Sequence, residues 1–165
     1  MKPPSSVDAL SEFGRARLSN SFFMRDFLYS DIAALHGFSN IPEDPDLAIA
    51  AGTKLCTELL EPLQGVFGRI AIRSAYRSAE VNGNMGATAC IVIPAFYDAF
   101  NAEGDWQKLA WWIHDHLPYS TLYFFPKLWA VNIQWRENPV RQIDSYTVPR
   151  GRLTDPGKPN FGGSH

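Results

Sequence analysis

The sequence predicts an α+β domain in which a small, mainly antiparallel sheet packs against helices. Three observations support this prediction. Two helical segments come first along the chain, strands and helices then follow in mixed order with short connections, and two short apolar segments late in the chain have the pattern of a hairpin. This order of elements favours an α+β domain over a doubly wound parallel one.

The helical segments lie in the first part of the chain. Residues 1–20 are polar, so we expect them to form a loosely ordered lead-in. A first helix is expected over residues 22–35, where apolar side chains recur at helical spacing. A second helix should begin at Asp44-Pro45, an N-cap residue followed by a proline in the first turn, and its leucine stripe continues to Gly65.

The later segments mix strands with helices. Helices are expected over residues 95–100 and 106–117, and strands are expected over residues 69–74, 87–93, 120–125 and 129–135, the last two as a hairpin. Beyond Glu137 the chain is rich in proline, glycine and polar residues. We therefore expect the folded domain to span residues 21–137, followed by a C-terminal extension over residues 138–165.

Composition excludes several classes of partner. The 165 residues carry 15 Lys plus Arg against 17 Asp plus Glu, a formal net charge of -2, which gives no electrostatic case for binding nucleic acid. No segment is apolar for the length that spans a bilayer, and the N-terminus lacks a signal-peptide pattern, so we expect no membrane insertion and a cytoplasmic protein as synthesised. Cys56 and Cys90 lie in apolar surroundings and are expected to be buried free thiols.

The most specific pattern runs from Gly68 to Asn82. A helix with Glu-Pro-Leu and Phe-Gly at its end leads into a strand and then into Ser74-x-Tyr76-Arg77-Ser78. This pattern resembles the zinc D-alanyl-D-alanine carboxypeptidase-like peptidases of bacteria and phages, which have the hedgehog/DD-peptidase fold. The resemblance extends over residues 22–135.

The resemblance implies a hydrolase of the bacterial cell wall that cuts peptidoglycan stem peptides with a zinc-bound water. It also implies substrate-binding roles for three residues. Arg77 would hold the substrate peptide through its fork of donors, and Ser74 and Tyr76 would shape the turn beside it. From residue type alone, Arg77 could equally cap a strand end and pair with Glu80.

The metal ligands of that family are not identifiable in this chain. Gly83 stands where relatives carry the first His, Cys90 where they carry Asp, and Asn132 or Arg136 where they carry the later His. At the two positions near the hairpin where that family carries acidic residues, this chain has Ser120 and Phe125, so a general base is missing as well. The resemblance therefore implies a zinc ion, but the residues that would bind it cannot be identified in this chain. A segment missing between Asn82 and Asn84 would explain the loss, and a chain break would be its sign.

One other cluster, His114-Asp115-His116 in the last expected helix, has the residue types that bind metals. Helical residues two apart point about 200° from one another, so the two histidines cannot share an ion without unwinding. We expect His116 to be partly buried and hydrogen-bonded, and His114 to be solvated.

Two functions therefore stay open. One is a zinc peptidase of the peptidoglycan stem peptide. The other is a non-catalytic module, a possible pseudoenzyme, that keeps the same scaffold for binding a cell-wall peptide or for a structural role. A weaker third idea is a domain of a larger assembly that docks through its aromatic hairpin and its tail.

Overall fold

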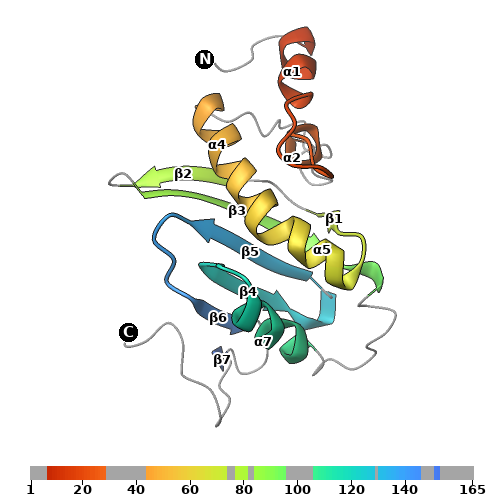
Figure 1. Ribbon diagram of the computed structural model, residues 1–165, viewed down its shortest axis with the longest axis vertical. Coiled ribbons are helices and arrows are strands. Elements are labelled where there is room, and N and C mark those ends of the chain that lie inside the picture. The colour runs from red at the N-terminus through yellow and green to blue at the C-terminus, as the bar shows by residue number, and fades with distance from the viewer. Residues whose placement is uncertain are drawn as a thin grey trace.

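The computed structural model describes residues 7–28, 44–73, 77–81, 84–95, 106–128, 130–145 and 151–152. Over these ranges, helices lie on one face of a single seven-stranded sheet (Figure 1). The α+β class is therefore confirmed. No helix within these ranges is long and apolar enough to cross a membrane.

The longest helix begins where the sequence predicts. The Asp44 carboxylate accepts a hydrogen bond of 3.1 Å from a backbone N–H of the first turn, which fixes the start of α4 (Pro45–Leu55). The helix continues through a π-helical turn (Cys56–Leu60) into α5 (Glu61–Phe67). It ends at Gly68, whose φ of 100° lies in a region that favours glycine.

The π-helical turn explains how this helix passes through a proline. Pro62 has no N–H to donate, and in a regular α-helix its ring would clash with the carbonyl of Glu58, four residues earlier. Here the N–H of Glu61 bonds to the carbonyl of Cys56, five residues earlier, so the turn is wider. The helix therefore continues beyond Pro62 without a break.

A second helix, α7 (Trp106–His116), covers the same face of the sheet and agrees with the predicted range. Its first residue packs on the sheet, because the Trp106 ring lies 4.9 Å from that of Phe124. The two long helices also meet each other, since Phe67 contacts Trp112 edge-on with ring centroids 4.9 Å apart. Aromatic pairs of this geometry stabilise beyond their buried area.

The N-terminal segment differs from the expected lead-in. Residues 7–14 form a helix, α1 (Val7–Gly14), and a short helix, α2 (Arg25–Leu28), follows it. Phe13 and Leu18 are buried in the main core. The remainder of the helix expected over residues 22–35 lies outside the described residues, as does most of the one expected over residues 95–100.

One carboxylate ties this segment to the long helix. Glu61 accepts hydrogen bonds from the Ser19 hydroxyl at 2.8 Å, from the Ser21 N–H at 2.6 Å and from the Ser21 hydroxyl at 3.1 Å. Hydrogen bonds to an ionised acceptor are stronger than neutral ones. Cys56 lies in the same area, where burial raises the pKa of its thiol and the charges of Glu61 and Asp26 raise it further.

The sheet has the strand order β1-β3-β5-β4-β6-β7, and β2 also pairs with β3. Its strands are β1 (Ala71–Ile72), β2 (Arg77–Val81), β3 (Asn84–Val92), β4 (Thr121–Phe125), β5 (Ala130–Arg136), β6 (Gln142–Ser145) and β7 (Gly151–Arg152). The predicted hairpin is confirmed as β4 and β5, which are antiparallel and joined at a 3-10 turn. The strand expected over residues 69–74 is shorter and corresponds to β1.

The sheet is mixed, which corrects the expectation of a mainly antiparallel one. Strand β6 pairs with β4 in parallel, because the chain leaves β5, passes the end of β4 and forms β6 on the far side of β4. The segment expected to be a surface extension therefore adds two strands. Ile143 and Ser145 are buried there, and the N–H of Gln142 bonds to the carbonyl of Ser120 at 2.9 Å.

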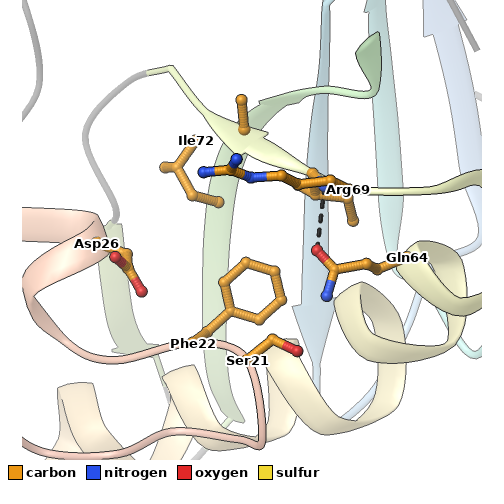
Figure 2. A pocket seen from close by; sticks show the side chains of 8 residues that line it. Ser21, Phe22, Asp26, Gln64, Arg69 and Ile72 are labelled. Atoms are coloured by element: carbon orange, nitrogen blue, oxygen red, sulfur yellow. Dashed lines mark hydrogen bonds between the residues drawn. The ribbon is translucent and has the colours of Figure 1, made fainter. Parts of the chain in front are cut away.

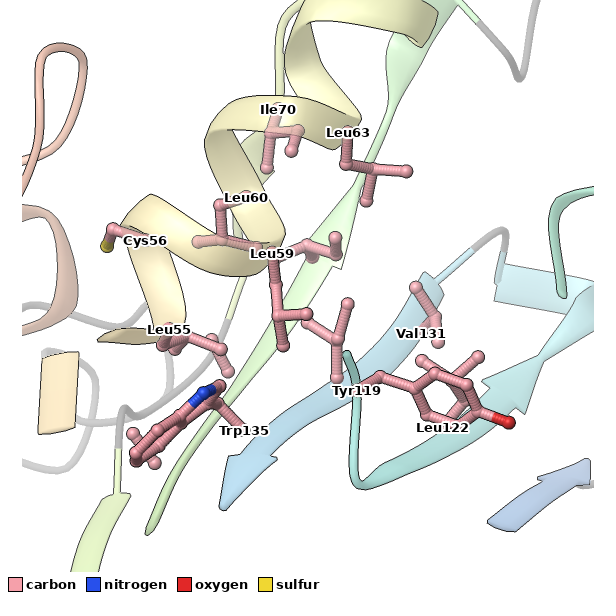
Figure 3. Packing of buried hydrophobic residues seen from close by; sticks show 14 of the residues in the cluster. Leu55, Cys56, Leu59, Leu60, Leu63, Ile70, Tyr119, Leu122, Val131 and Trp135 are labelled. Atoms are coloured by element: carbon pink, nitrogen blue, oxygen red, sulfur yellow. The ribbon is translucent and has the colours of Figure 1, made fainter. Parts of the chain in front are cut away.

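The core lies between the long helices and the covered face of the sheet (Figure 3). Leu55, Leu59 and Leu63 of the long helix are fully buried over the sheet. Cys56 is buried and Cys90 is half-buried, and neither forms a disulfide. The predicted free thiols are thus confirmed, with full burial only for Cys56.

We expect Leu59→Ala to lower the free energy of unfolding by about 2–5 kcal/mol, because it leaves a cavity in a close-packed core. Leu59 has no exposed surface. Urea denaturation followed by circular dichroism measures the change. The matched control is Val66→Ala on the same helix, where the side chain is 57% exposed, and the expected change there is within about 0.5 kcal/mol. Equal losses in the two variants would contradict this description of the core.

Candidate functional site

The two faces of the sheet differ in chemistry. The face under α4, α5 and α7 is apolar and buried, with Ala87, Ala89, Ile91, Leu122, Phe124, Val131, Ile133 and Trp135. We call the opposite face the open face, because none of these three helices lies on it (Figure 1). Its half-buried residues are mostly polar: Thr88, Cys90, Thr121, Tyr123, Phe125, Asn132, Gln134, Arg136, Gln142 and Asp144.

A hydrogen-bonded row crosses three strands of the open face. The Thr121 hydroxyl donates to the Gln134 side-chain oxygen at 3.2 Å, and the Gln134 side-chain nitrogen donates to the Thr88 hydroxyl at 3.2 Å. Both bonds together fix the orientation of the Gln134 amide. Gln134 therefore presents a fixed donor and acceptor in the middle of the sheet.

Arg77 takes its place at the end of the same row. It is the Cα partner of Thr88 in the β2–β3 ladder, and directly opposite residues belong to the same face of a sheet. Its side chain is outside the described part of the structure, and so are Ser74 and Tyr76. The register thus brings Arg77 to the open face, while the roles expected for all three residues stay predictions.

A second row contains two of the three positions that the resemblance assigns to metal ligands. Cys90 and Asn132 are Cα partners on adjacent strands, and Tyr123 is the next partner of Asn132. Positions so far apart in sequence thus meet in one row. They carry a thiol and an amide in place of the expected Asp and His. Among the described residues, no group of three His, Cys, Asp or Glu side chains could hold a metal ion.

The positions expected to carry acids are structural. Ser120 is fully buried, and its hydroxyl accepts a hydrogen bond of 3.2 Å from the Val140 N–H. Phe125 ends β4 and packs on Tyr123, with ring centroids 5.1 Å apart. Neither residue can act as a general base.

Arg136, the alternative position for the later His, lies over Gly86 on the open face. A side chain at Gly86 would meet the Arg136 Cγ at 3.1 Å and the Trp135 carbonyl at 3.2 Å. The Nε of Arg136 is buried, and no described residue accepts its hydrogen bond. Sequence reasoning used Arg136 only as a poor zinc ligand. The period-two series Asn132, Gln134, Arg136 was the signal that these side chains share one polar face.

The strand register also bears on the proposed missing segment. Val81 and Asn84 are Cα partners at the end of the β2–β3 ladder. This register is the one that a two-residue hairpin connection produces, and Asn-Gly is the sequence most typical of such a connection. Asn82 and Gly83 themselves lie outside the described residues. The register of their neighbours gives no indication of a longer loop.

The two histidines of α7 have the reverse of their expected burial, whereas the hydrogen bond expected for His116 is present, since its Nδ1 lies 2.9 Å from the Trp112 carbonyl oxygen. His114 is half-buried, and its Nδ1 lies 2.7 Å from the Tyr119 hydroxyl. Burial raises the pKa of Tyr119, so its hydroxyl stays protonated beside His114. His116 is exposed and stacks on the Trp112 ring with centroids 4.5 Å apart. The expected exposure of His114 was wrong because the chain after α7 turns back and brings Tyr119 against it.

A pocket of about 590 Å³ lies at the edge of the sheet that β1 forms (Figure 2). We call it the β1-edge pocket; it is lined by Ser21, Phe22, Asp26, Gln64, Arg69, Ile70, Ala71 and Ile72. Its walls come from α2 and the segment before it, from α5, and from β1 with the two residues before that strand. No local sequence pattern indicates this pocket, because its residues come from the N-terminal segment and from residues 64–72, which are far apart in the chain.

Comparison with known proteins adds no relative: no family model, no curated protein and no solved structure matches the chain.

We expect Gly86→Ala to destabilise the protein by about 1–3 kcal/mol, because the new methyl group would press on Arg136 and on the β5 backbone. Thermal unfolding measures the loss. Gly65→Ala is the control, since a side chain at Gly65 would meet no atom within 4 Å and alanine favours a helix. A stabilising effect of Gly86→Ala would show that Arg136 does not pack on Gly86.

Proposed function

We propose that this protein is a non-catalytic peptide-binding module on a scaffold of the hedgehog/DD-peptidase type, and that an extended cell-wall peptide binds its open face. The pairing of Cys90 with Asn132 carries the proposal. Two of the three positions that the resemblance assigns to metal ligands are neighbours on this face, which supports a shared scaffold. Their side chains are those of a polar surface and not of a zinc site.

The residues present do not fit a catalytic zinc ion. Such a site needs three protein ligands with an open fourth position. The described residues of the open face offer one thiol, Cys90, and one carboxylate, Asp144, in the same row, separated by the positions of Asn132 and Tyr123. No hydrolytic step through a metal can be derived from this arrangement.

The same residues do suit a peptide main chain. Amide side chains donate and accept at once, as peptide groups do, and Gln134 and Asn132 lie on neighbouring rows of the same strand. Gln134 is already held by two hydrogen bonds, so little side-chain entropy is lost on binding. Tyr123 and Phe125 supply an aromatic surface beside the amides.

Charge on the open face favours a peptide with a carboxylate. Arg136 brings a guanidinium to the end of β5, and Arg77 occupies a register position in the neighbouring row. Stem peptides of the kind that the resemblance implies end in a carboxylate. The guanidinium group binds a carboxylate through two parallel hydrogen bonds.

The first test of the proposal is the metal content of the purified protein together with its activity. We expect no stoichiometric zinc by mass spectrometry and no release of D-alanine from an L-Lys-D-Ala-D-Ala peptide with zinc added. Stoichiometric zinc with D-alanine release would overturn the proposal in favour of the peptidase.

The second test is binding of the same peptide by calorimetry. We expect Arg136→Gln to weaken binding about tenfold, because a charged hydrogen bond contributes about 1.5–3 kcal/mol. Arg15→Gln, directly after α1, is the matched control and should bind as the unmodified protein does, since Arg15 is exposed and pairs with Glu12 at 3.3 Å. Equal affinity of all three proteins would contradict binding at the open face.

A further inference from the structure

The β1-edge pocket brings together the outer edge of a strand and the polar side chains of Arg69, Gln64 and Asp26. Strand β1 pairs with β3 on one side only, within the described residues. Its other side faces the pocket, because Arg69, Ile70, Ala71 and Ile72 all line it. A strand edge of this kind can accept a further strand.

The hydrogen bonds show which backbone groups of β1 point outward. The N–H of Arg73 bonds to the carbonyl of Cys90 at 2.8 Å, so these two residues form a hydrogen-bonded pair. Hydrogen-bonded and non-hydrogen-bonded pairs alternate along an antiparallel ladder. The next pair, Ile72 with Ile91, is therefore non-hydrogen-bonded, and the N–H and C=O of Ile72 point away from β3.

Gln64 confirms the direction of this edge. The N–H of Ile70, two residues before Ile72, points outward by the same alternation and donates to the Gln64 side-chain oxygen at 3.1 Å. The outward N–H of Ile70 is thus already hydrogen-bonded to a side chain. No described residue accepts a hydrogen bond from Ile72. One donor and one acceptor of β1 stay open toward the pocket.

The side chains of the pocket add charge on both walls. Figure 2 shows Arg69 extending along β1 above Gln64 and Phe22, with Asp26 on the opposite wall. In the described part of the chain, no carboxylate lies within ion-pair distance of Arg69. The Asp26 carboxylate accepts a hydrogen bond from the Phe23 N–H at 2.8 Å.

We infer that the β1-edge pocket binds the carboxyl-terminal end of an extended peptide, which adds to β1 as a further strand. The backbone groups of Ile72 pair with the peptide main chain. The guanidinium of Arg69 and the side-chain nitrogen of Gln64 hold the terminal carboxylate. The partly exposed Ile72 side chain supplies an apolar surface that a peptide side chain covers, and the pocket volume lies within the range of small-ligand sites.

This inference goes beyond the proposed function and rests on no part of it. The open face is built by Thr88, Asn132 and Gln134, and none of these residues lines the pocket. The two sites can therefore succeed or fail separately.

The test uses a probe with and without the charge that Arg69 would bind. ¹⁵N-labelled protein is titrated with N-acetyl-Ala-Val-Ala carrying a free carboxylate, and with the same peptide as its carboxyl-terminal amide. We expect the free acid to shift the backbone amide of Ile72 and the side-chain amide of Gln64, and to slow hydrogen exchange at Ile72. The amide form should bind about tenfold more weakly.

Arg69→Gln tests the same contact from the side of the protein and should weaken binding of the free acid about tenfold. Arg73→Gln is the matched control, an exposed arginine of the same segment outside the pocket, and it should bind normally. Equal binding of acid and amide would overturn the inference, and this comparison needs no variant. Shifts confined to Thr88, Asn132 and Gln134 would also overturn it while leaving the open-face proposal intact.

Discussion

Strand β3 is the constraint on which the rest of the structure depends. It is the one strand in the described sheet that pairs with three others, β1 and β2 along one edge and β5 along the other. Its alternate residues Ala87, Ala89 and Ile91 are buried under the helices. A one-residue slip would send these side chains to the open face and every polar neighbour into the core. Burial of the apolar set therefore fixes the register that brings Cys90 opposite Asn132.

The small side chains of β3 explain how the long helix approaches the sheet. Ala87 and Ala89 leave space that Leu55 and Leu59 fill from α4 and the π-helical turn, all of them buried in one core. Close packing of this kind leaves few alternative arrangements. The same strand thus sets the distance between the layers and the order of residues on the face beyond them.

Hydrophobic periodicity was enough to predict the elements whose partners are close in sequence. The stripe from Leu47 to Leu63 predicted the long helix, and the alternation on both sides of residues 126–128 predicted the β4–β5 hairpin. It could not predict the parallel strand β6. That strand has only Ile143 as a large apolar residue, and its place depends on which sheet edge is vacant, which is a property of the assembled fold.

The two candidate sites also differ in how far local sequence patterns could predict them. The alternation of Asn132, Gln134 and Arg136 was visible in the sequence, although their meaning as one face required the register of three strands. The β1-edge pocket was beyond reach, because Phe22, Gln64 and Arg69 are brought together only by packing of the N-terminal segment on α5. The carboxylate of Glu61 makes that contact, and no local pattern connects it with Ser19 or Ser21.

The π-helical turn also matters for the way a straight helix meets a twisted sheet. In a regular α-helix, residues eight apart are offset by about 80° around the axis, which would turn Leu63 away from the direction of Leu55. A wider turn between them rotates less per residue and reduces that offset, and both leucines are fully buried. The single extra residue accommodated at Cys56–Leu60 thus acts as a phase correction. It lets one continuous helix keep the same side toward the sheet from its first turn to its last.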